Sequence, residues 1–441
     1  MKNEQVHAII GPQKSSQAKF VIELGGKAEV PIVSFAATSP TLSATQSKYF
    51  VRTAQDDSSQ VKAIASIVQA YGWREIVLIH EDTEYGNGLV PFLLDAFQEI
   101  DTRVPYRSRI PLYFNDTQIM RELINLKATR NSIFLVHMSA SLGSRLFLLA
   151  KDAGMMSEGY AWLVTAGLST LLDTLGSEVM DSMQGVLGIK PHIPTSKKLE
   201  SFKSRWSKNF TTSKPQSRIN ELNLFGLWAY DTVWAIAMAV EKAGIVRSRY
   251  VKPNTSESTV DIAALGKSET GQRLLSSILS TRFQGLSGDF HLAGGERVPS
   301  AFEILNLNGK ARVIGYWTPE RGLSRNLYAN GKIAYSTSKN KLKEPLWPGD
   351  TTQQPKRLRI GVPKKTGFEE LIKVEWNPED KPNVSGFTPD VFFSVVEALP
   401  FPLQYEFIPF VNKNKQSAGT YDDLLCQIKL KVGFMPLQFF P

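Results

Sequence analysis

Short apolar runs alternate with amphipathic stretches through the first part of the chain, and this alternation constrains the fold more than any other feature. The apolar runs are typical of buried strands, and the stretches between them repeat apolar residues with helical spacing. We expect strands at 6–10, 32–35, 75–80, 133–138 and 160–165, and helices at 15–29, 61–72, 89–100, 117–126 and 142–153. Such alternation predicts parallel sheets covered by helices on both faces, so the expected fold class is α/β.

The pattern changes after residue 199. Residues 199–279 are mostly helical, and 220–243 is the longest expected helix, with Trp228, Val233, Ile236 and Val240 on its apolar side. From 283 to 317 the spacing favours strands again. Asn308-Gly309 is typical of a hairpin turn, and it lies between two apolar runs at 304–307 and 311–314.

A polar stretch divides the sequence into two folded units. Residues 324–356 are rich in Asn, Ser, Thr, Lys, Gln and Pro, which favours a linker. A new apolar run at 358–362 then opens a second unit, with a helix at 389–399 and a strand at 404–408. We therefore expect a domain at 1–322, a linker at 323–355 and an incomplete second domain at 356–441.

The sequence contains no complete motif for catalysis or for metal binding. Cys426 is the single cysteine, which excludes a disulfide framework and a cysteine-based zinc site. The five histidines lie far apart, and none forms a closely spaced pair. Phosphate-loop, dinucleotide-binding and serine-nucleophile motifs are incomplete or missing. We expect no metal, no cofactor and no enzymatic activity.

The net charge and the targeting signals of the sequence indicate which partners and which compartment to expect. The formal net charge of +9 is mild for 441 residues, and its cations form no block that would favour nucleic acid. The sequence contains no apolar run of 18 residues that would predict a transmembrane helix, and its first residues lack the apolar core of a signal peptide. Four glycosylation motifs point weakly toward export, at Asn115, Asn209, Asn254 and Asn383.

Small polar residues follow the first two expected strands. Ser15 and Ser16 lie between a strand and a helix, and Ala37 and Thr38 come after the next strand. Ligands of parallel sheets bind beyond the carboxyl ends of the strands. Hydroxyl groups and the free N–H groups of a helix start together suit a carboxylate. The alternative interpretation is that Ser15, Ser16 and Thr38 only cap helices and turns.

The same residues lie within a series of segments that resembles a known family. The segments of the first unit are similar, in order, to the amino-terminal domain of plant glutamate receptor-like channels, and those of the second unit resemble the start of the family's agonist-binding domain. The matching segments are 8–12, 30–40, 50–52, 71–77, 84–86, 136–138 and 144–147, followed by 358–363, 386–392 and 419–424.

The resemblance implies a fold. The first domain would be a two-lobed periplasmic-binding-protein-like type I fold with an incomplete first lobe. A partial type II periplasmic-binding-like segment would follow it. The two lobes of the first domain would close over an amino acid.

The resemblance also implies roles for individual residues. Ser16 matches a residue that contacts the carboxylate of the ligand, and Thr38 and Asp57 match positions near its ammonium group. Tyr85 matches a residue of the second lobe that forms a wall of the site. Ser15 and Ala37 complete the expected ligand-binding set. This chain has Ala166 where relatives often have an acid. A lost charge-assisted hydrogen bond weakens binding by about 10- to 150-fold, so we expect a weakened amino acid site.

We therefore expect the extracellular ligand-sensing portion of a ligand-gated cation channel of the plasma membrane, truncated before the pore and not itself conducting. Expected partners are an amino acid and, in a homo- or hetero-oligomer, channel subunits. Because of Ala166, the alternative is a non-binding interaction or assembly module related to the channel subunits.

Overall fold

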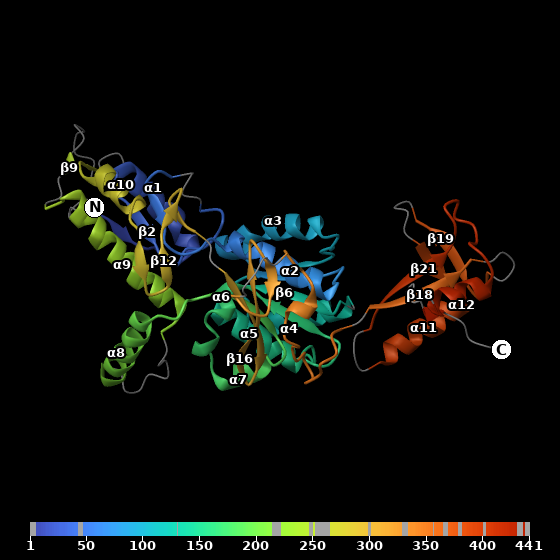
Figure 1. The fold of residues 1–441 in the computed structure, drawn as a ribbon. Coiled ribbons are helices and arrows are strands. Elements are labelled where there is room, and N and C mark those ends of the chain that lie inside the picture. Colours follow the sequence, from blue (N-terminus) through green and yellow to red (C-terminus); the bar gives the residue numbers. More distant parts are fainter. Residues whose placement is uncertain are drawn as a thin grey trace.

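The protein is described here by a computed structural model. It describes residues 6–42, 47–129, 131–213, 222–246, 250–251, 265–298, 301–328, 334–355, 357–364, 369–377, 382–399, 403–429 and 435–436. The polar stretch at 248–259, which is typical of a surface loop, falls almost entirely outside these residues, as do the first five residues and the glycosylation motif at Asn254. Figure 1 shows three bodies along the molecule: a first lobe, a second lobe and a third unit.

The first lobe contains a five-stranded sheet in the order β1-β2-β3-β14-β13. Its first three strands are parallel, as the crossover pattern predicts. The strands are β1 (Ile9–Ile10), β2 (Ile32–Ser34), β3 (Phe50–Arg52), β13 (Leu292–Ala293) and β14 (Glu296–Arg297). The helices of this lobe are α1 (Ser15–Ala28), α8 (Lys197–Ser213), α9 (Leu224–Ala243) and α10 (Gly271–Leu279). Short strand pairs also belong to it: β9 (Tyr250–Val251) with β10 (Lys267–Ser268), and β11 (Phe283–Gly285) with β12 (Gly288–Phe290).

The second lobe is built on an eight-stranded sheet in the order β17-β16-β15-β8-β7-β6-β4-β5. Strands β4 to β8 are parallel, and β15 to β17 continue the sheet antiparallel. Its strands are β4 (Val77–Glu81), β5 (Arg107–Ile110), β6 (Ile133–His137), β7 (Ala161–Val164), β8 (Leu187–Pro191), β15 (Phe302–Asn308), β16 (Lys310–Thr318) and β17 (Gly322–Ser324). The expected hairpin at Asn308-Gly309 is confirmed, with Gly309 at φ 66°.

Helices cover both faces of this second sheet. Successive strand residues point to opposite faces, and apolar residues on each face are buried against helices. Leu78 packs with α2 (Val61–Tyr71) and α3 (Glu84–Glu99) on one face. Its neighbours Val77 and Ile79 pack with α4 (Asp116–Ala128) and α5 (Ala140–Asp152) on the other face. Two shorter helices, α6 (Ala166–Ser169) and α7 (Ser177–Ser182), follow β7.

The chain passes between the two lobes three times within the described residues. The passages run from β3 to β4, from β8 to α8 and from β14 to β15. The first passage contains a 3₁₀ helix, η1 (Asp57–Gln60), which leads directly into α2. Connections of this kind are where hinge motions between two lobes occur in proteins that close around ligands.

The longest helix was expected to bury Val233, and that expectation is wrong. Val233 is 53% exposed, whereas Asp231 and Thr232 are buried on the opposite side of α9. The Asp231 carboxylate accepts hydrogen bonds from the backbone N–H groups of Leu286 (2.7 Å) and Ser287 (3.0 Å). A buried carboxylate with backbone donors therefore orients this helix, and hydrophobic spacing alone does not reveal it.

Part of the expected linker packs against the second lobe. Leu342 and Trp347 are almost fully buried in the core that contains α2. The Trp347 ring meets those of Tyr71 and Trp73 edge-on, with ring centroids 5.0 and 5.9 Å apart. Despite the polar composition of residues 323–355, apolar side chains such as Leu342 and Trp347 therefore pack this stretch against the lobe.

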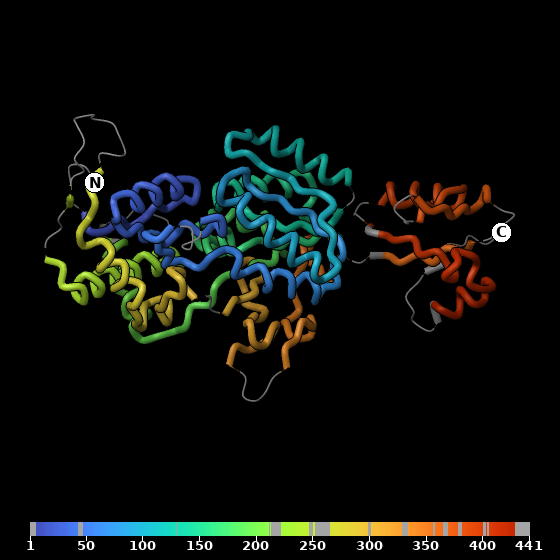
Figure 2. Tube along the Cα trace, turned by 90° about the horizontal axis from the view of Figure 1, so that it is seen from above, coloured from blue at the N-terminus to red at the C-terminus, as the bar shows by residue number. Residues whose placement is uncertain are grey.

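The third unit lies beyond the second lobe in both views (Figures 1 and 2). It contains a parallel sheet in the order β21-β18-β22, together with a hairpin of β19 and β20. Its elements are β18 (Arg357–Pro363), β19 (Lys373–Trp376), β20 (Pro382–Ser385), α11 (Phe387–Ala398), β21 (Gln404–Phe410), α12 (Tyr421–Lys429) and β22 (Met435–Pro436). The strands expected at 358–362 and 404–408 and the helix expected at 389–399 are confirmed.

Candidate functional site

A small cavity of about 20 Å³ lies where the two lobes meet. Thr38, after β2 in the first lobe, and Asp57, in the first passage, both line it. So does Ala166 at the start of α6, after β7 of the second lobe. The remaining lining residues are Gln55, Asp56, Ser59, Gln60, Gly167, Thr170, Pro191, Phe225, Trp228 and Phe302. Residues from both lobes therefore converge on one point, as a hinged binding fold requires.

Asp57 is the most perturbed acid of this cavity. Burial raises the pKa of its carboxyl group to about 7, although the Thr38 hydroxyl and the side chains of Arg52 and Gln60 favour the charged form. The Gln60 side-chain amide donates to Oδ1 at 2.9 Å. The other oxygen, Oδ2, is buried without a hydrogen-bond partner among the described residues. An unpartnered buried oxygen is costly unless a donor reaches it.

Gln60 also connects the two sides of the cavity. Its Oε1 atom accepts a hydrogen bond from the backbone N–H of Ala166 at 2.7 Å. At the position where the resemblance implies an acid in relatives, this chain thus presents the methyl group of Ala166, and the N–H of the same residue is already engaged by Gln60. Gln60 was not among the residues expected from the sequence, since nothing in its local pattern indicates this role.

Tyr85 lies at the N-terminal end of α3 and reaches toward the same place. A Cβ atom on Gly167 would lie 1.9 Å from the Tyr85 hydroxyl oxygen, so the ring occupies space that only a glycine leaves open. Burial, with Asp57 and Glu81 nearby, raises the pKa of this hydroxyl well above its usual value. Tyr85 therefore forms a neutral wall beside the cavity.

His137, at the end of β6, supports this wall. Its Nε2 atom is 3.1 Å from the Tyr85 carbonyl oxygen, and its Nδ1 atom is 2.9 Å from the Thr165 hydroxyl. Burial lowers the pKa of His137 to about 3, so the ring is neutral near pH 7. Its segment belongs to the matching series, but the sequence indicates no role for it.

The remaining expected residues lie at the edge of this group. Ser15 is buried, and its Oγ accepts a hydrogen bond from the Ser39 N–H at 3.3 Å. The Ala37 N–H donates to the Ser34 Oγ at 3.0 Å. Ser16 is exposed and does not line the cavity. The structure therefore brings Thr38, Asp57 and Tyr85 together and places Ser16 outside them.

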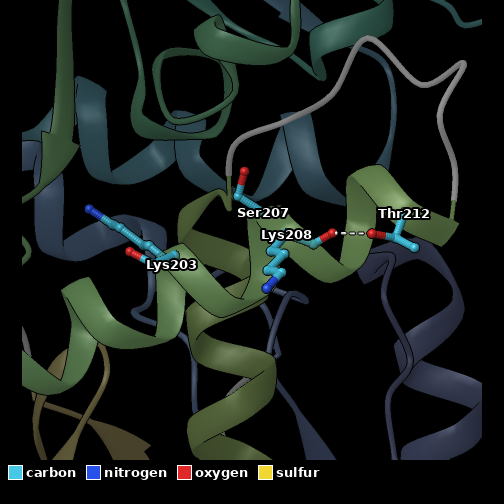
Figure 3. A pocket seen from close by; sticks show the side chains of 5 residues that line it. Lys203, Ser207, Lys208 and Thr212 are labelled. Atoms are coloured by element: carbon cyan, nitrogen blue, oxygen red, sulfur yellow. Dashed lines mark hydrogen bonds between the residues drawn. The ribbon is translucent and has the colours of Figure 1, made fainter.

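A larger cavity of about 340 Å³ adjoins the small one and shares Thr170 and Pro191 with it. Its walls also come from both lobes, with Lys190 from β8 and Lys203 and Trp206 from α8. A further hollow lies on the exposed surface of α8 alone and is lined by Lys203, Ser204, Ser207, Lys208 and Thr212 (Figure 3). Because a single helix forms that hollow, we place the candidate site between the lobes.

The described residues show neither a metal-binding cluster nor a membrane-spanning helix. No three His, Cys, Asp or Glu side chains gather there as a metal ion would require. None of the helices in that part of the chain combines the length and apolar content needed to cross a bilayer.

Two hinged α/β lobes with a polar site between them define a periplasmic-binding-protein-like protein of type I. The family described as receptor family ligand binding region matches residues 1–310, and the chain belongs to this family. Its relatives place it among the plant glutamate receptor-like proteins.

Three receptors of Arabidopsis thaliana illustrate this similarity. The chain is 43% identical to glutamate receptor 2.2 over 98% of its own length and 47% of the receptor. It is 41% identical to glutamate receptor 2.1, over 97% of the chain and 48% of the receptor. It is 42% identical to glutamate receptor 2.3, over 98% of the chain and 49% of the receptor. The chain thus spans about half the length of the curated relatives that it matches.

Proposed function

We propose that the cleft between the two lobes binds an amino acid, and that the chain is the extracellular ligand-sensing portion of a ligand-gated cation channel. The single observation that carries the binding proposal is the buried Oδ2 atom of Asp57, which lacks a hydrogen-bond partner among the described residues. An ammonium group is the donor that would satisfy a buried carboxylate best, because the two charges reinforce the hydrogen bond.

The other proposed ligand contacts follow from position. The Thr38 hydroxyl lies beside Asp57 and supplements the ammonium site. Tyr85 offers a neutral aromatic wall, which also favours a cation. Ser15, Ser16 and Ala37 complete the proposed set at the start of α1 and after β2, where hydroxyl groups and backbone N–H groups suit a carboxylate.

Ligand entry requires the lobes to separate. A cavity of about 20 Å³ holds roughly one water molecule and is far too small for an amino acid. The described arrangement therefore represents the closed form of the cleft. In this proposal, an open form admits the ligand and closure buries it against Asp57.

An interaction or assembly module is the second candidate function. Two observations favour it: the methyl side chain of Ala166 at the cavity, and the engagement of its N–H by Gln60. In that case the domain would pair with channel subunits through its surface, and the cleft would stay closed without a ligand. For both candidate functions we propose that the chain works at the plasma membrane, in a homo- or hetero-oligomer with channel subunits.

Isothermal titration of the whole chain with a panel of amino acids tests the binding proposal. We expect heat with at least one amino acid, and we expect the Thr38→Val variant to bind it more weakly because a hydroxyl next to Asp57 is lost. The matched control is Thr212→Val on exposed helix α8, which should bind normally. If the folded chain gives no heat with any amino acid, the binding proposal is wrong and the assembly module is favoured.

A further inference from the structure

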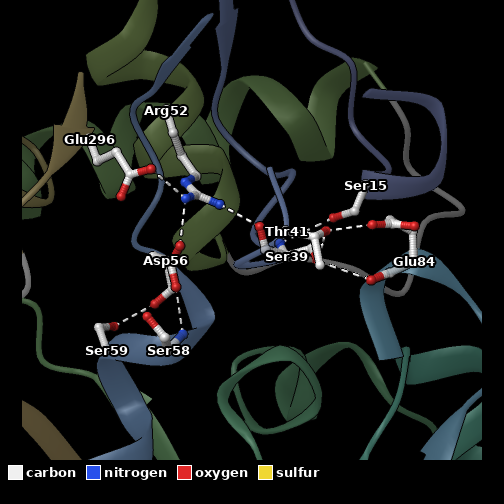
Figure 4. Close-up of polar contacts among 9 residues, drawn as sticks. All are labelled: Ser15, Ser39, Thr41, Arg52, Asp56, Ser58, Ser59, Glu84 and Glu296. Carbon is white, nitrogen blue, oxygen red and sulfur yellow. Dashed lines mark hydrogen bonds and ion pairs between the residues drawn. The ribbon is translucent and has the colours of Figure 1, made fainter. Parts of the chain in front are cut away.

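The two lobes also contact each other outside the cleft, where the loop after β2 meets the first turn of α3. The Ser39 hydroxyl donates to the Glu84 backbone carbonyl at 2.9 Å, and the Thr41 hydroxyl donates to the Glu84 Oε1 at 2.5 Å. Ser39 is fully buried, whereas Thr41 and Glu84 are exposed. Figure 4 shows the three side chains together, with Glu84 on the second lobe opposite Ser39 and Thr41 on the first.

A glycine on α3 makes this close approach possible. A Cβ atom on Gly88 would lie 2.1 Å from the Ser39 hydroxyl oxygen and 3.2 Å from the Thr41 methyl group. Gly88 sits one helical turn after Glu84, so both residues face the same loop. The surface of α3 is therefore shaped to receive the Ser39 side chain.

Ser39 is linked in turn to the hinge and to the proposed ligand contacts. Its carbonyl oxygen accepts a hydrogen bond from the Arg52 guanidinium at 2.7 Å, and Arg52 also contacts Asp56 in the first passage and Glu296 in β14, the strand before the third passage. Its backbone N–H donates to Ser15 at 3.3 Å. A movement of α3 relative to the first lobe would therefore affect the contacts of Ser39 with both Arg52 and Ser15 (Figure 4).

We propose that Ser39, Thr41, Glu84 and Gly88 form a latch that holds the two lobes closed, independently of any ligand. Exposed side chains such as Thr41 and Glu84 contribute little energy alone. The buried Ser39 contact and the Gly88 recess give the latch its geometry. Because the contacts lie outside the cleft, the latch sets the balance between open and closed forms whatever binds there.

A distance measurement between the lobes tests this latch. Spin labels at Lys19→Cys on α1 and Asp95→Cys on α3, in the Cys426→Ser background of the full chain, report the separation by double electron–electron resonance. Both label positions are exposed. We expect Gly88→Ala to lengthen and broaden the distance distribution, because the added methyl group displaces Ser39. Gly26→Ala on α1 is the matched control, since its Cβ atom meets nothing closer than 3.9 Å, and it should leave the distribution unchanged.

A pair of milder variants keeps the test decisive if Gly88→Ala does not fold. Thr41→Val and Glu84→Met remove the side-chain hydrogen bond, because the first lacks the hydroxyl donor and the second lacks the oxygen acceptor. We expect each of them to broaden the distance distribution, and the double variant to equal the stronger single one, because both act on one contact. Distributions identical to that of the parent chain in folded variants would overturn the latch, and they would leave amino acid binding in the cleft unaffected.

Discussion

Arg52 and Glu296 lie 244 positions apart in the sequence, and their side chains meet at 2.6 Å. Arg52 ends strand β3 and Glu296 begins β14, so the contact joins the two strands that precede the first and third passages between the lobes. The guanidinium is fully buried and also contacts Asp56 at 2.5 Å. One side chain thus contacts both the first connection between the lobes and the strand that leads into the third.

Arg52→Met should destabilise the first domain by about 2–3 kcal/mol. Removing one partner of a buried ion pair costs about 3–5 kcal/mol, and partial exposure of Asp56 and Glu296 reduces that figure. Urea unfolding of the full chain measures the change. Arg52→Lys keeps the charge but not the planar fork, so it should fall between the variant and the parent. An unfolding midpoint for Arg52→Met equal to that of the parent would contradict this role of Arg52.

Trp347→Ala should destabilise the second lobe by about 3–5 kcal/mol, because a fully buried aromatic side chain leaves a cavity. The ring is only 2% exposed and packs on Tyr71 and Trp73. Tyr328→Ala, at a position 80% exposed, is the control and should change stability by less than about 0.5 kcal/mol. Thermal unfolding compares the two, and equal effects would mean that the stretch at 323–355 is an independent linker.

The titration of Asp57 should make stability fall as pH rises. Its pKa in the folded chain is about 7, above the ordinary value of 3.8, so the folded state holds a proton that the unfolded state has lost. This contribution is fully present below about pH 4 and disappears as pH rises through about 7. The free energy of unfolding of the parent, measured relative to Asp57→Asn, should therefore decrease between pH 4 and 8, by at most about 4 kcal/mol. Parallel pH curves for the two proteins would show that Asp57 is not buried as described.

His137 should act in the opposite direction. Burial lowers its pKa from 6.5 to about 3, so its neutral form stabilises the fold above about pH 6.5, and that contribution is lost as pH falls toward 3. We expect His137→Gln to lose less stability than the parent over this range, by at most about 5 kcal/mol. The comparison uses the difference between the free energies of unfolding of the parent and of His137→Gln, because the carboxylates titrate equally in the two proteins. A difference that stays constant from pH 7 to 4 would contradict a buried neutral His137.

Local sequence patterns predict most elements of this fold and some of its site. The helix expected at 15–29, the hairpin at Asn308-Gly309 and the strands around 77–81 and 133–137 agree with the structure, because periodicity and turn chemistry are local. The buried face of α9 and the burial of Trp347 depend on distant partners and therefore escape such reasoning.

Thr38 and Asp57 line the same cavity and Tyr85 lies near Asp57, whereas their ligand contacts come from the resemblance and stay a prediction. Gln60 and Gly167 are site features of a different kind. Each is defined by a neighbour that is distant in the sequence, at Ala166 in the first case and at Tyr85 in the second. Those neighbours lie about 80 to 110 positions away in the sequence, and no spacing rule connects residues at such separations.

The pairing of Asp57 with a ligand ammonium group is the central claim, and calorimetry with glutamate and its deaminated analogue glutarate tests it most directly. The same comparison should follow for whichever amino acid of the panel gives the most heat. We predict that the parent chain binds the amino acid at least about tenfold more tightly than the analogue, and that Asp57→Asn abolishes this preference. Equal affinities of the parent for both compounds, or an unchanged preference in Asp57→Asn, would contradict the account.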